Sequence, residues 1–139
     1  MAQTVRDVMT PQPVHVKEST NLVDAARAMR DRDIGDLIVV RNGEILGMVT
    51  DRDIVIRGLA KGGDPKTMTV GEICSTDVVT VAPDESVDTV IKLMREKAVR
   101  RIPVVDDRKP VGILSLGDLA MRKDKDSVLS DISEAPPQR

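Results

Sequence analysis

The chain repeats itself at a spacing of 65 residues: Val5 aligns with Val70 (70 − 5), and the alignment continues without a gap. Among the aligned segments, 47–53 coincides with 112–118 in both apolar pattern and polar positions. A repeat determines the architecture of a chain before any local motif does. Because two copies are too few for a solenoid, the sequence predicts one pseudo-symmetric domain built from a duplicated half.

Length and composition indicate that the two copies depend on each other. A copy of roughly 60 residues buries too little surface to be comfortably stable alone, so we expect the copies to share one core. The chain has no Phe, Tyr or Trp, so this core must consist of Val, Ile, Leu, Met and Ala. We assign residues 1–64 to the first repeat with its linker, 65–126 to the second, and 127–139 to a C-terminal tail whose end is expected to be disordered.

The composition argues against several classes of partner. A net charge of −2 and an isoelectric point near 5.4 give no electrostatic footprint for nucleic acid, and the absence of aromatic residues removes stacking platforms for single strands. No segment is apolar over the roughly 18 residues of a membrane span, so no membrane partner is expected. With one cysteine and no signal-peptide core, we expect a cytoplasmic location.

Each copy shows the same order of predicted elements: a helical turn, a brief strand, a capped helix, a hairpin and a final helix. Asn42-Gly43 is a strong hairpin signal, and Pro103, which lacks an amide donor, predicts that its strand lies at an edge or begins there. Ser19 or Thr20, and Asp84, are expected N-caps of the longer helices. The expected elements are turns at 5–9 and 70–74, strands at 14–16 and 79–81, hairpin strands at 37–40 with 45–49 and 102–105 with 111–114, and helices after Thr50 and Ser115.

A motif stands where the second hairpin strand gives way to a helix: Gly-x-x-Thr-x-x-Asp at 47–53 and Gly-x-x-Ser-x-x-Asp at 112–118. A hydroxyl residue followed three positions later by an acid approximates a capping box. The same arrangement can bind an anion such as phosphate at the helix start, with the carboxylate accepting from ribose hydroxyls. The two interpretations are compatible.

The repeat order, this motif and Val-Arg-Arg-Ile-Pro-Val-Val-Asp at 99–106 resemble a tandem pair of cystathionine-β-synthase (CBS) domains, also called a Bateman module. The resemblance covers residues 5–122, and the run 47–60 is similar to stand-alone bacterial members of the hypoxic response protein type. It implies an α+β fold of two pseudo-symmetric repeats, each a small β-sheet packed on helices. It also implies a non-enzymatic regulatory homodimer that signals to a regulated protein by changing conformation or partner binding.

The resemblance further implies two clefts that bind AMP, ADP, ATP or S-adenosylmethionine, with no cofactor required. In the family's pattern, the Thr or Ser meets phosphate, the Asp meets ribose hydroxyls, and the adenine lies against the opposite repeat. Carried over by position, cleft A contains Ile113, Ser115, Asp118 and Arg101 with Val14, Ile34 and Gly35, and cleft B contains Met48, Thr50 and Asp53 with Val79, Val99 and Arg100.

The two clefts are not expected to be equal. Arg101 aligns with Asp36 (101 − 65), and a charge a few ångströms from a phosphate contributes up to several kcal/mol before screening. Phosphate is therefore expected to prefer the cleft of Asp118 and Arg101. The alternative for Arg101 is a solvated surface side chain.

Other residues support rival interpretations. His15 and Cys74 are the only histidine and cysteine, which leaves no convincing zinc site or Cys–His nucleophile pair, so an enzyme ranks third. A ligand-free stress-response interaction module is the leading alternative, favoured by Asp36 and Asp51. Apolar residues of the final helices predict either an exposed dimer interface or part of the core: Ile54, Val55, Ile56 and Leu59, and Leu116, Leu119 and Ala120.

Overall fold

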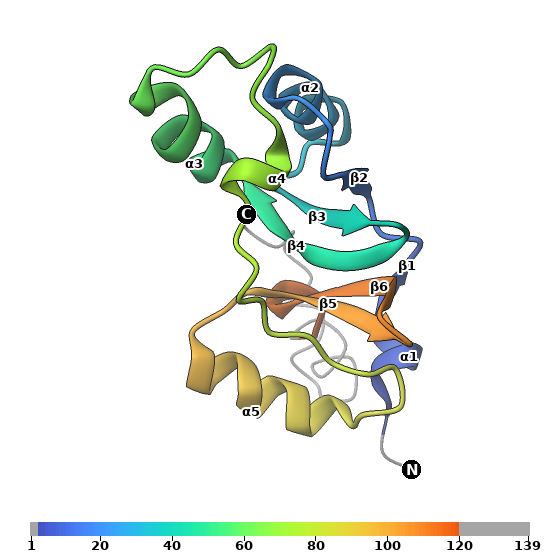
Figure 1. Ribbon diagram of the computed structural model, residues 1–139. Coiled ribbons are helices and arrows are strands. Elements are labelled where there is room, and N and C mark those ends of the chain that lie inside the picture. The colour runs from blue at the N-terminus through green and yellow to red at the C-terminus, as the bar shows by residue number, and fades with distance from the viewer. Residues whose placement is uncertain (1–2, 120–139) are drawn as a thin grey trace. The chain divides into compact units, whose positions relative to one another are not determined.

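The computed structural model, in which residues 3–119 are described, divides the chain into two compact units (Figure 1). Residues 14–78 form what we call the continuous unit, and residues 1–13 together with 79–139 form the split unit. The units therefore do not follow the two sequence repeats, because each takes in the opening segment of the other repeat. The tail at 127–139 lies outside the described residues.

The continuous unit is a three-stranded sheet in the order β2-β3-β4, with β2 parallel to β3 and β3 antiparallel to β4. A helical segment follows β4 directly and includes one π-helical turn, η1. The elements are β2 (His15–Lys17), α2 (Leu22–Arg32), β3 (Asp36–Arg41), β4 (Glu44–Thr50), α3 (Asp51–Asp53), η1 (Ile54–Gly58), η2 (Leu59–Lys61) and α4 (Val70–Ile73).

The split unit contains a sheet in the order β1-β6-β5, in which both neighbouring pairs are antiparallel. Helix α5 covers one face of the β5–β6 hairpin (Figure 1). The elements are α1 (Val5–Val8), β1 (Thr10–Pro11), α5 (Val87–Lys97), β5 (Arg101–Asp106) and β6 (Lys109–Ser115), and residues 116–119 are helical. The predicted edge position of Pro103 is confirmed, because β5 is the last strand in this order.

Both hairpins turn through two residues of positive φ, the geometry that matches the twist of the flanking strands. Asn42 and Gly43 have φ of 52° and 80°, as their sequence predicts. Asp107 and Arg108 have φ of 52° and 66°, so the second hairpin makes the same kind of turn without a glycine.

The strand predicted at 79–81 is reduced to a single bridge between Val81 and Val104, and Pro103 is the reason. In the continuous unit, the amide of Ile38 donates to the carbonyl of Val14 at 3.4 Å. Pro103 occupies the position equivalent to Ile38 and has no amide hydrogen to donate, so the corresponding bond to Val79 cannot form. The strand predicted at 14–16 is present, displaced by one residue.

The N-caps predicted for the longer helices are wrong. The side chain of Asn21 caps α2 by accepting from the amide of Asp24 at 2.8 Å, and Ser86 caps α5 by accepting from the amide of Thr89 at 3.2 Å. The helices begin only at their first buried residues, Leu22 and Val87. The cap position therefore falls immediately before that apolar residue, beyond Thr20 and Asp84.

Most buried apolar residues form two clusters, one within each unit, so the expectation of one shared core is wrong. Ile38, Val40 and Ile113 are buried but belong to neither cluster. In the split unit, Val5 and Val8 of α1 pack with residues of the second repeat. In the continuous unit, Val70 and Ile73 of α4 pack with residues of the first repeat. Each core thus contains side chains of both repeats, so neither repeat completes a core without residues of the other.

Candidate functional site

The Thr-x-x-Asp motif of the continuous unit joins the end of β4 to the start of the helical segment. The hydroxyl of Thr50 accepts from the amide of Asp53 at 3.0 Å, and the Asp53 carboxylate accepts from the amide of Thr50 at 2.9 Å. The capping-box interpretation is therefore confirmed here. The other carboxylate oxygen of Asp53 lies 3.7 Å from Arg57 Nε.

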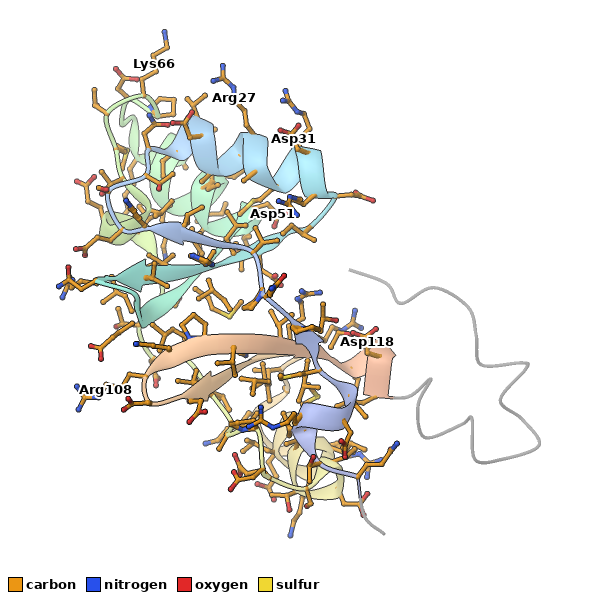
Figure 2. All side chains as sticks on the ribbon, turned by 90° about the vertical axis from the view of Figure 1, so that its right-hand side faces the viewer. Arg27, Asp31, Asp51, Lys66, Arg108 and Asp118 are labelled. Carbon is orange, nitrogen blue, oxygen red and sulfur yellow. The ribbon has the colours of Figure 1, made fainter. Side chains whose placement is uncertain are left out.

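The split unit repeats this arrangement at the end of β6. The hydroxyl of Ser115 accepts from the amide of Asp118 at 3.0 Å, and Ser115 is buried. Figure 2 labels Asp118 in the split unit and Asp51 in the continuous unit, and each lies in the helical turn that follows its own hairpin. Both units therefore hold a hydroxyl and a carboxylate at equivalent positions.

The residue before each hairpin is bound to the helix start of the same unit. The amide of Asp51 donates to the carbonyl of Gly35 at 3.0 Å, and the amide of Leu116 donates to the carbonyl of Arg100 at 2.7 Å. The two bonds are related by the repeat. They bring the predicted adenine-contacting segment of each unit to the end of its second hairpin strand.

Strand register places one charged residue opposite each hydroxyl. Asp36 pairs with Thr50 across β3 and β4, and Arg101 pairs with Ser115 across β5 and β6. Directly opposite residues of an antiparallel pair project to the same face, with Cβ atoms roughly 5 Å apart. The sequence alignment of Arg101 with Asp36 is therefore a structural equivalence.

The structure divides each predicted cleft between the two units. The continuous unit holds Val14, Ile34, Gly35, Met48, Thr50 and Asp53, and the split unit holds Val79, Val99, Arg100, Arg101, Ile113, Ser115 and Asp118. Within its own unit, each set lies at the hairpin entry, the brief strand or the strand end. The joining of these sets into clefts A and B stays a prediction.

The glycine of each motif has a structural role that the sequence analysis missed. The peptide of Ser75 crosses β4 beside Gly47, and Met48 and Ser75 exchange two backbone hydrogen bonds of 2.9 Å. A Cβ on Gly47 would overlap the Ser75 carbonyl oxygen. No local signal in the sequence indicates this approach, because only the fold brings Ser75 beside β4. The aligned residue Thr10 pairs with β6 beside Gly112 in the same way.

The helices that follow the hairpins expose apolar side chains. Val55, Ile56, Leu59 and Leu116 are 52%, 49%, 48% and 40% exposed, and they are the large hydrophobic residues exposed among residues 3–119. Ile54 and Leu119 were expected in the same stripe but are buried, since they point into the cores of their units. Ala120 lies outside the described residues.

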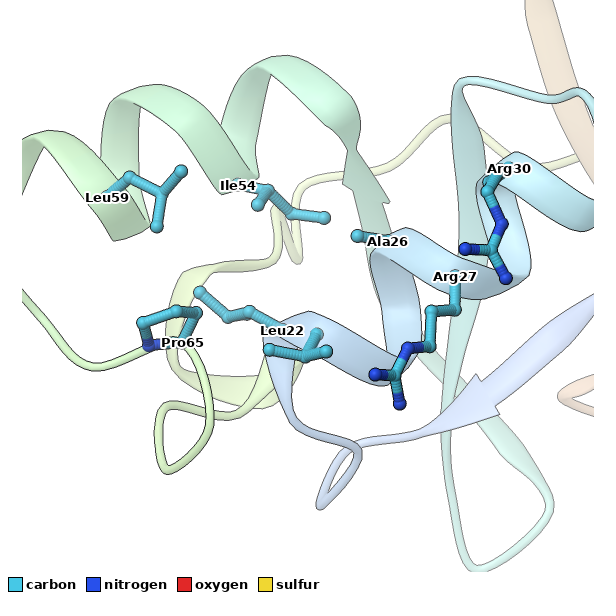
Figure 3. A pocket seen from close by; sticks show the side chains of 8 residues that line it. Leu22, Ala26, Arg27, Arg30, Ile54, Leu59 and Pro65 are labelled. Atoms are coloured by element: carbon cyan, nitrogen blue, oxygen red, sulfur yellow. The ribbon is translucent and has the colours of Figure 1, made fainter.

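An apolar groove adjoins this surface in the continuous unit, between α2 and the helical segment (Figure 3). Its volume is about 310 Å³. Leu22 and Ile54 lie at its base, while Arg27 and Arg30 of α2 flank it. Leu59, one of the exposed apolar residues, also lines this groove.

His15 and Cys74 both belong to the continuous unit but lie in different surroundings. His15 is exposed on β2, whereas Cys74 packs half-buried against the core of the continuous unit. Burial raises the pKa of the Cys74 thiol, which disfavours the reactive thiolate. The described part of the chain contains no group of three or more His, Cys, Asp or Glu side chains placed to hold a metal ion. Within the same residues, no helix is long and apolar enough to cross a membrane.

The sequence model of the CBS domain matches the chain twice, at residues 5–59 and 70–124. The chain belongs to the CBS domain family. Its two repeats make it a CBS domain pair, a regulatory module, and they confirm the resemblance and the fold class that the sequence predicts.

Relatives of this CBS pair include hypoxic response protein 1 of Mycobacterium tuberculosis, 42% identical over 118 residues, which are 84% of this chain and 82% of the relative. A crystal structure of Hypoxic Response Protein I with two coordinated zinc ions is similar with a TM-score of 0.78 and 40% identity, over 86% of this chain and 98% of that one. The CBS pair of protein MJ0100, in complex with 5′-methylthioadenosine and S-adenosyl-L-methionine, has a TM-score of 0.78 and 28% identity, over 91% of this chain and 100% of that one.

Among residues 3–119, no set of His, Cys, Asp or Glu side chains is placed to hold a zinc ion such as those of Hypoxic Response Protein I. Structural zinc sites use four Cys, His or carboxylate ligands, and with one histidine and one cysteine in this sequence most ligands of such a site would have to be carboxylates. His15 and Cys74 belong to no such cluster among the described residues.

Proposed function

We propose that this CBS pair binds an adenosine-containing ligand, AMP, ADP, ATP or S-adenosylmethionine, and reports it to a regulated protein. The observation that carries the proposal is the hydroxyl–carboxylate arrangement that recurs at equivalent strand ends, Thr50 with Asp53 and Ser115 with Asp118. The adenosyl ligands of the neighbouring MJ0100 pair support the ligand class. In our proposal, the hydroxyls contact phosphate and the carboxylates contact ribose.

The proposed adenine contacts come from the residues before the hairpins and from the brief strands: Val14, Ile34 and Gly35, and Val79, Val99 and Arg100. Signalling would follow from linkage, because a ligand that binds one arrangement of the repeats more tightly raises the population of that arrangement. A ligand with equal affinity for both arrangements would change nothing. The residues of the site bind and orient a ligand, and we assign none of them a catalytic role.

The proposal predicts that AMP binding depends more on Asp118 than on Asp53. Asp118→Ala removes a charge-assisted contact to ribose at the site that also holds Arg101, and should weaken AMP binding about 10- to 100-fold. Asp53→Ala should leave that binding largely unchanged. Isothermal titration calorimetry measures both affinities, and circular dichroism checks folding.

Opposite sensitivities of the two variants would contradict this assignment. The absence of Trp and Tyr also makes a co-purified adenine compound easy to detect, because the protein itself absorbs little near 280 nm. A spectrum without an adenine band near 260 nm, followed by no heat on titration with AMP, ATP or S-adenosylmethionine, would favour the alternative. That alternative is a ligand-free interaction module, with Asp36 and Asp51 repelling phosphate at Thr50.

We also propose a homodimer formed through the exposed helical face of Val55, Ile56 and Leu59. The wild-type protein should then sediment at about twice the 15.2 kDa mass of the chain. Ile56→Glu places a charge in the interface and should shift the equilibrium to monomer by about 100-fold or more. Lys61→Glu, on the same helical segment outside the apolar face, is the matched control. Analytical ultracentrifugation measures the equilibrium, and a monomeric wild type or an unaffected Ile56→Glu variant would rule the interface out.

A cytoplasmic location and the absence of nucleic-acid partners stay predictions from composition.

A further inference from the structure

We propose that the two strand-end sites select adenosyl ligands of different charge, which deepens the proposed function and rests on it. The site at Ser115 takes a phosphorylated adenosine. The site at Thr50 takes an unphosphorylated adenosyl ligand with a cationic 5′ substituent, such as a sulfonium. Arg101 and Asp36 are the residues that determine this difference.

The strand register of each hairpin places one charged residue beside each hydroxyl. Arg101 lies directly opposite Ser115, and Asp36 lies directly opposite Thr50. Each charged side chain therefore begins on the same sheet face as its hydroxyl, at a Cβ separation of roughly 5 Å. A ligand group that contacts the hydroxyl of either site lies close to that charge.

A second carboxylate adds to the difference at the Thr50 site. Asp51 accepts from the amide of Arg52 at 2.8 Å, and its other oxygen lies 3.2 Å from the position of a Cβ on Gly35. Its side chain is therefore held against the backbone that leads into Asp36. In the split unit, the equivalent of Asp51 is Leu116, which has no charge.

The cations near Thr50 do not remove this asymmetry. Arg57 Nε lies 3.7 Å from Asp53, and Arg57 also donates to the carbonyl of Ile73 at 3.2 Å. With Arg52 and Arg57 both counted, residues 36, 51–53 and 57 carry three carboxylates and two guanidinium groups, a net charge of −1. Residues 101 and 116–118 carry one of each. A phosphate dianion at the Thr50 site thus meets excess negative charge that the Ser115 site lacks.

Unphosphorylated adenosyl ligands fit the chemistry of a CBS pair. The MJ0100 pair is in complex with 5′-methylthioadenosine, which is neutral at its 5′ group, and with S-adenosyl-L-methionine, which is a sulfonium. Ribose recognition requires only the hydroxyls that all these ligands share with AMP. The charge beside Thr50 and Ser115 is then free to determine which 5′ substituent each site accepts.

The test is calorimetric titration of the full chain with AMP, S-adenosylmethionine and 5′-methylthioadenosine. We expect one AMP per chain and one S-adenosylmethionine per chain, with neither displacing the other, and weaker binding of neutral 5′-methylthioadenosine at the Thr50 site. Arg101→Asp should weaken AMP binding about 10- to 100-fold, and Asp36→Arg should create a second AMP site. The gain of a site distinguishes altered selectivity from simple damage.

Asp36→Asn is the conservative variant if Asp36→Arg fails to fold. It should lower the affinity for S-adenosylmethionine several-fold while leaving the affinity for 5′-methylthioadenosine unchanged. Two equivalent AMP sites in the wild type, or competition of AMP with S-adenosylmethionine for one site, would overturn the charge selection and leave the proposed function intact. Absence of binding by all three compounds would overturn both.

Discussion

Gly47→Ala is expected to destabilise the protein by about 3 kcal/mol, a large effect for a single added methyl group. The new Cβ would overlap the carbonyl oxygen of Ser75 and lie 2.9 Å from its carbonyl carbon. These are backbone atoms held by two hydrogen bonds to Met48, so relief requires moving the peptide and weakening both bonds. Urea unfolding followed by circular dichroism measures the change in free energy.

Two other glycines provide matched controls. A Cβ on Gly112, the equivalent position in the split unit, meets the side chain of Met9 and lies 3.0 Å from the carbonyl oxygen of Thr10. Because a methionine side chain can move, Gly112→Ala should destabilise less than Gly47→Ala. A Cβ on Gly35 would contact only the exposed carboxylate of Asp51. Gly35→Ala should therefore change the free energy of unfolding by less than about 1 kcal/mol. Equal stability of the Gly47 and Gly35 variants would contradict the close approach seen at Ser75.

Val5→Asp should unfold the region formed mostly by the second repeat, although Val5 belongs to the first. Val5 has no exposed surface and packs in the core of the split unit. An unpaired carboxylate there destabilises by about 3–5 kcal/mol. Hydrogen exchange followed by mass spectrometry should show the loss of protection in α5, β5 and β6.

Val70→Asp is the reciprocal variant, since Val70 is equally buried but packs in the core of the continuous unit. Protection should then be lost in α2, β3 and β4. If each substitution instead affected the repeat to which it belongs in sequence, the division into continuous and split units would be wrong.

Much of the fold could be predicted because its signals are local. Asn42-Gly43 favours positive φ at both turn positions, and the hairpin forms there. The capping interaction of Thr50 with Asp53 lies within one turn of helix, so its spacing in the sequence is enough to indicate it. The predicted cap of α2 is wrong because several polar residues precede this helix, and only the burial of Leu22 selects Asn21 as the cap.

Part of the candidate site could also be predicted, because its motif residues lie close together in the sequence. The motif residues were found from their spacing, and the alignment of Asp36 with Arg101 followed from the repeat. The position of Asp36 opposite Thr50, and of Arg101 opposite Ser115, depends on strand register. The glycine requirement at Gly47 depends on Ser75, which is 28 residues away along the chain (75 − 47).

The amino-acid sequence alone is enough to identify a duplicated CBS pair with a hydroxyl–carboxylate motif at the end of each second hairpin strand. These features repeat at a fixed spacing or lie within a few residues of one another, so no knowledge of distant contacts is needed to find them. The packing of α1 with the second repeat and of α4 with the first is seen only in the folded protein. Burial of an apolar face can be satisfied by any complementary surface, because the hydrophobic effect has no direction. The repeat of 65 residues therefore specifies two equivalent halves, while packing decides which segments complete each of them.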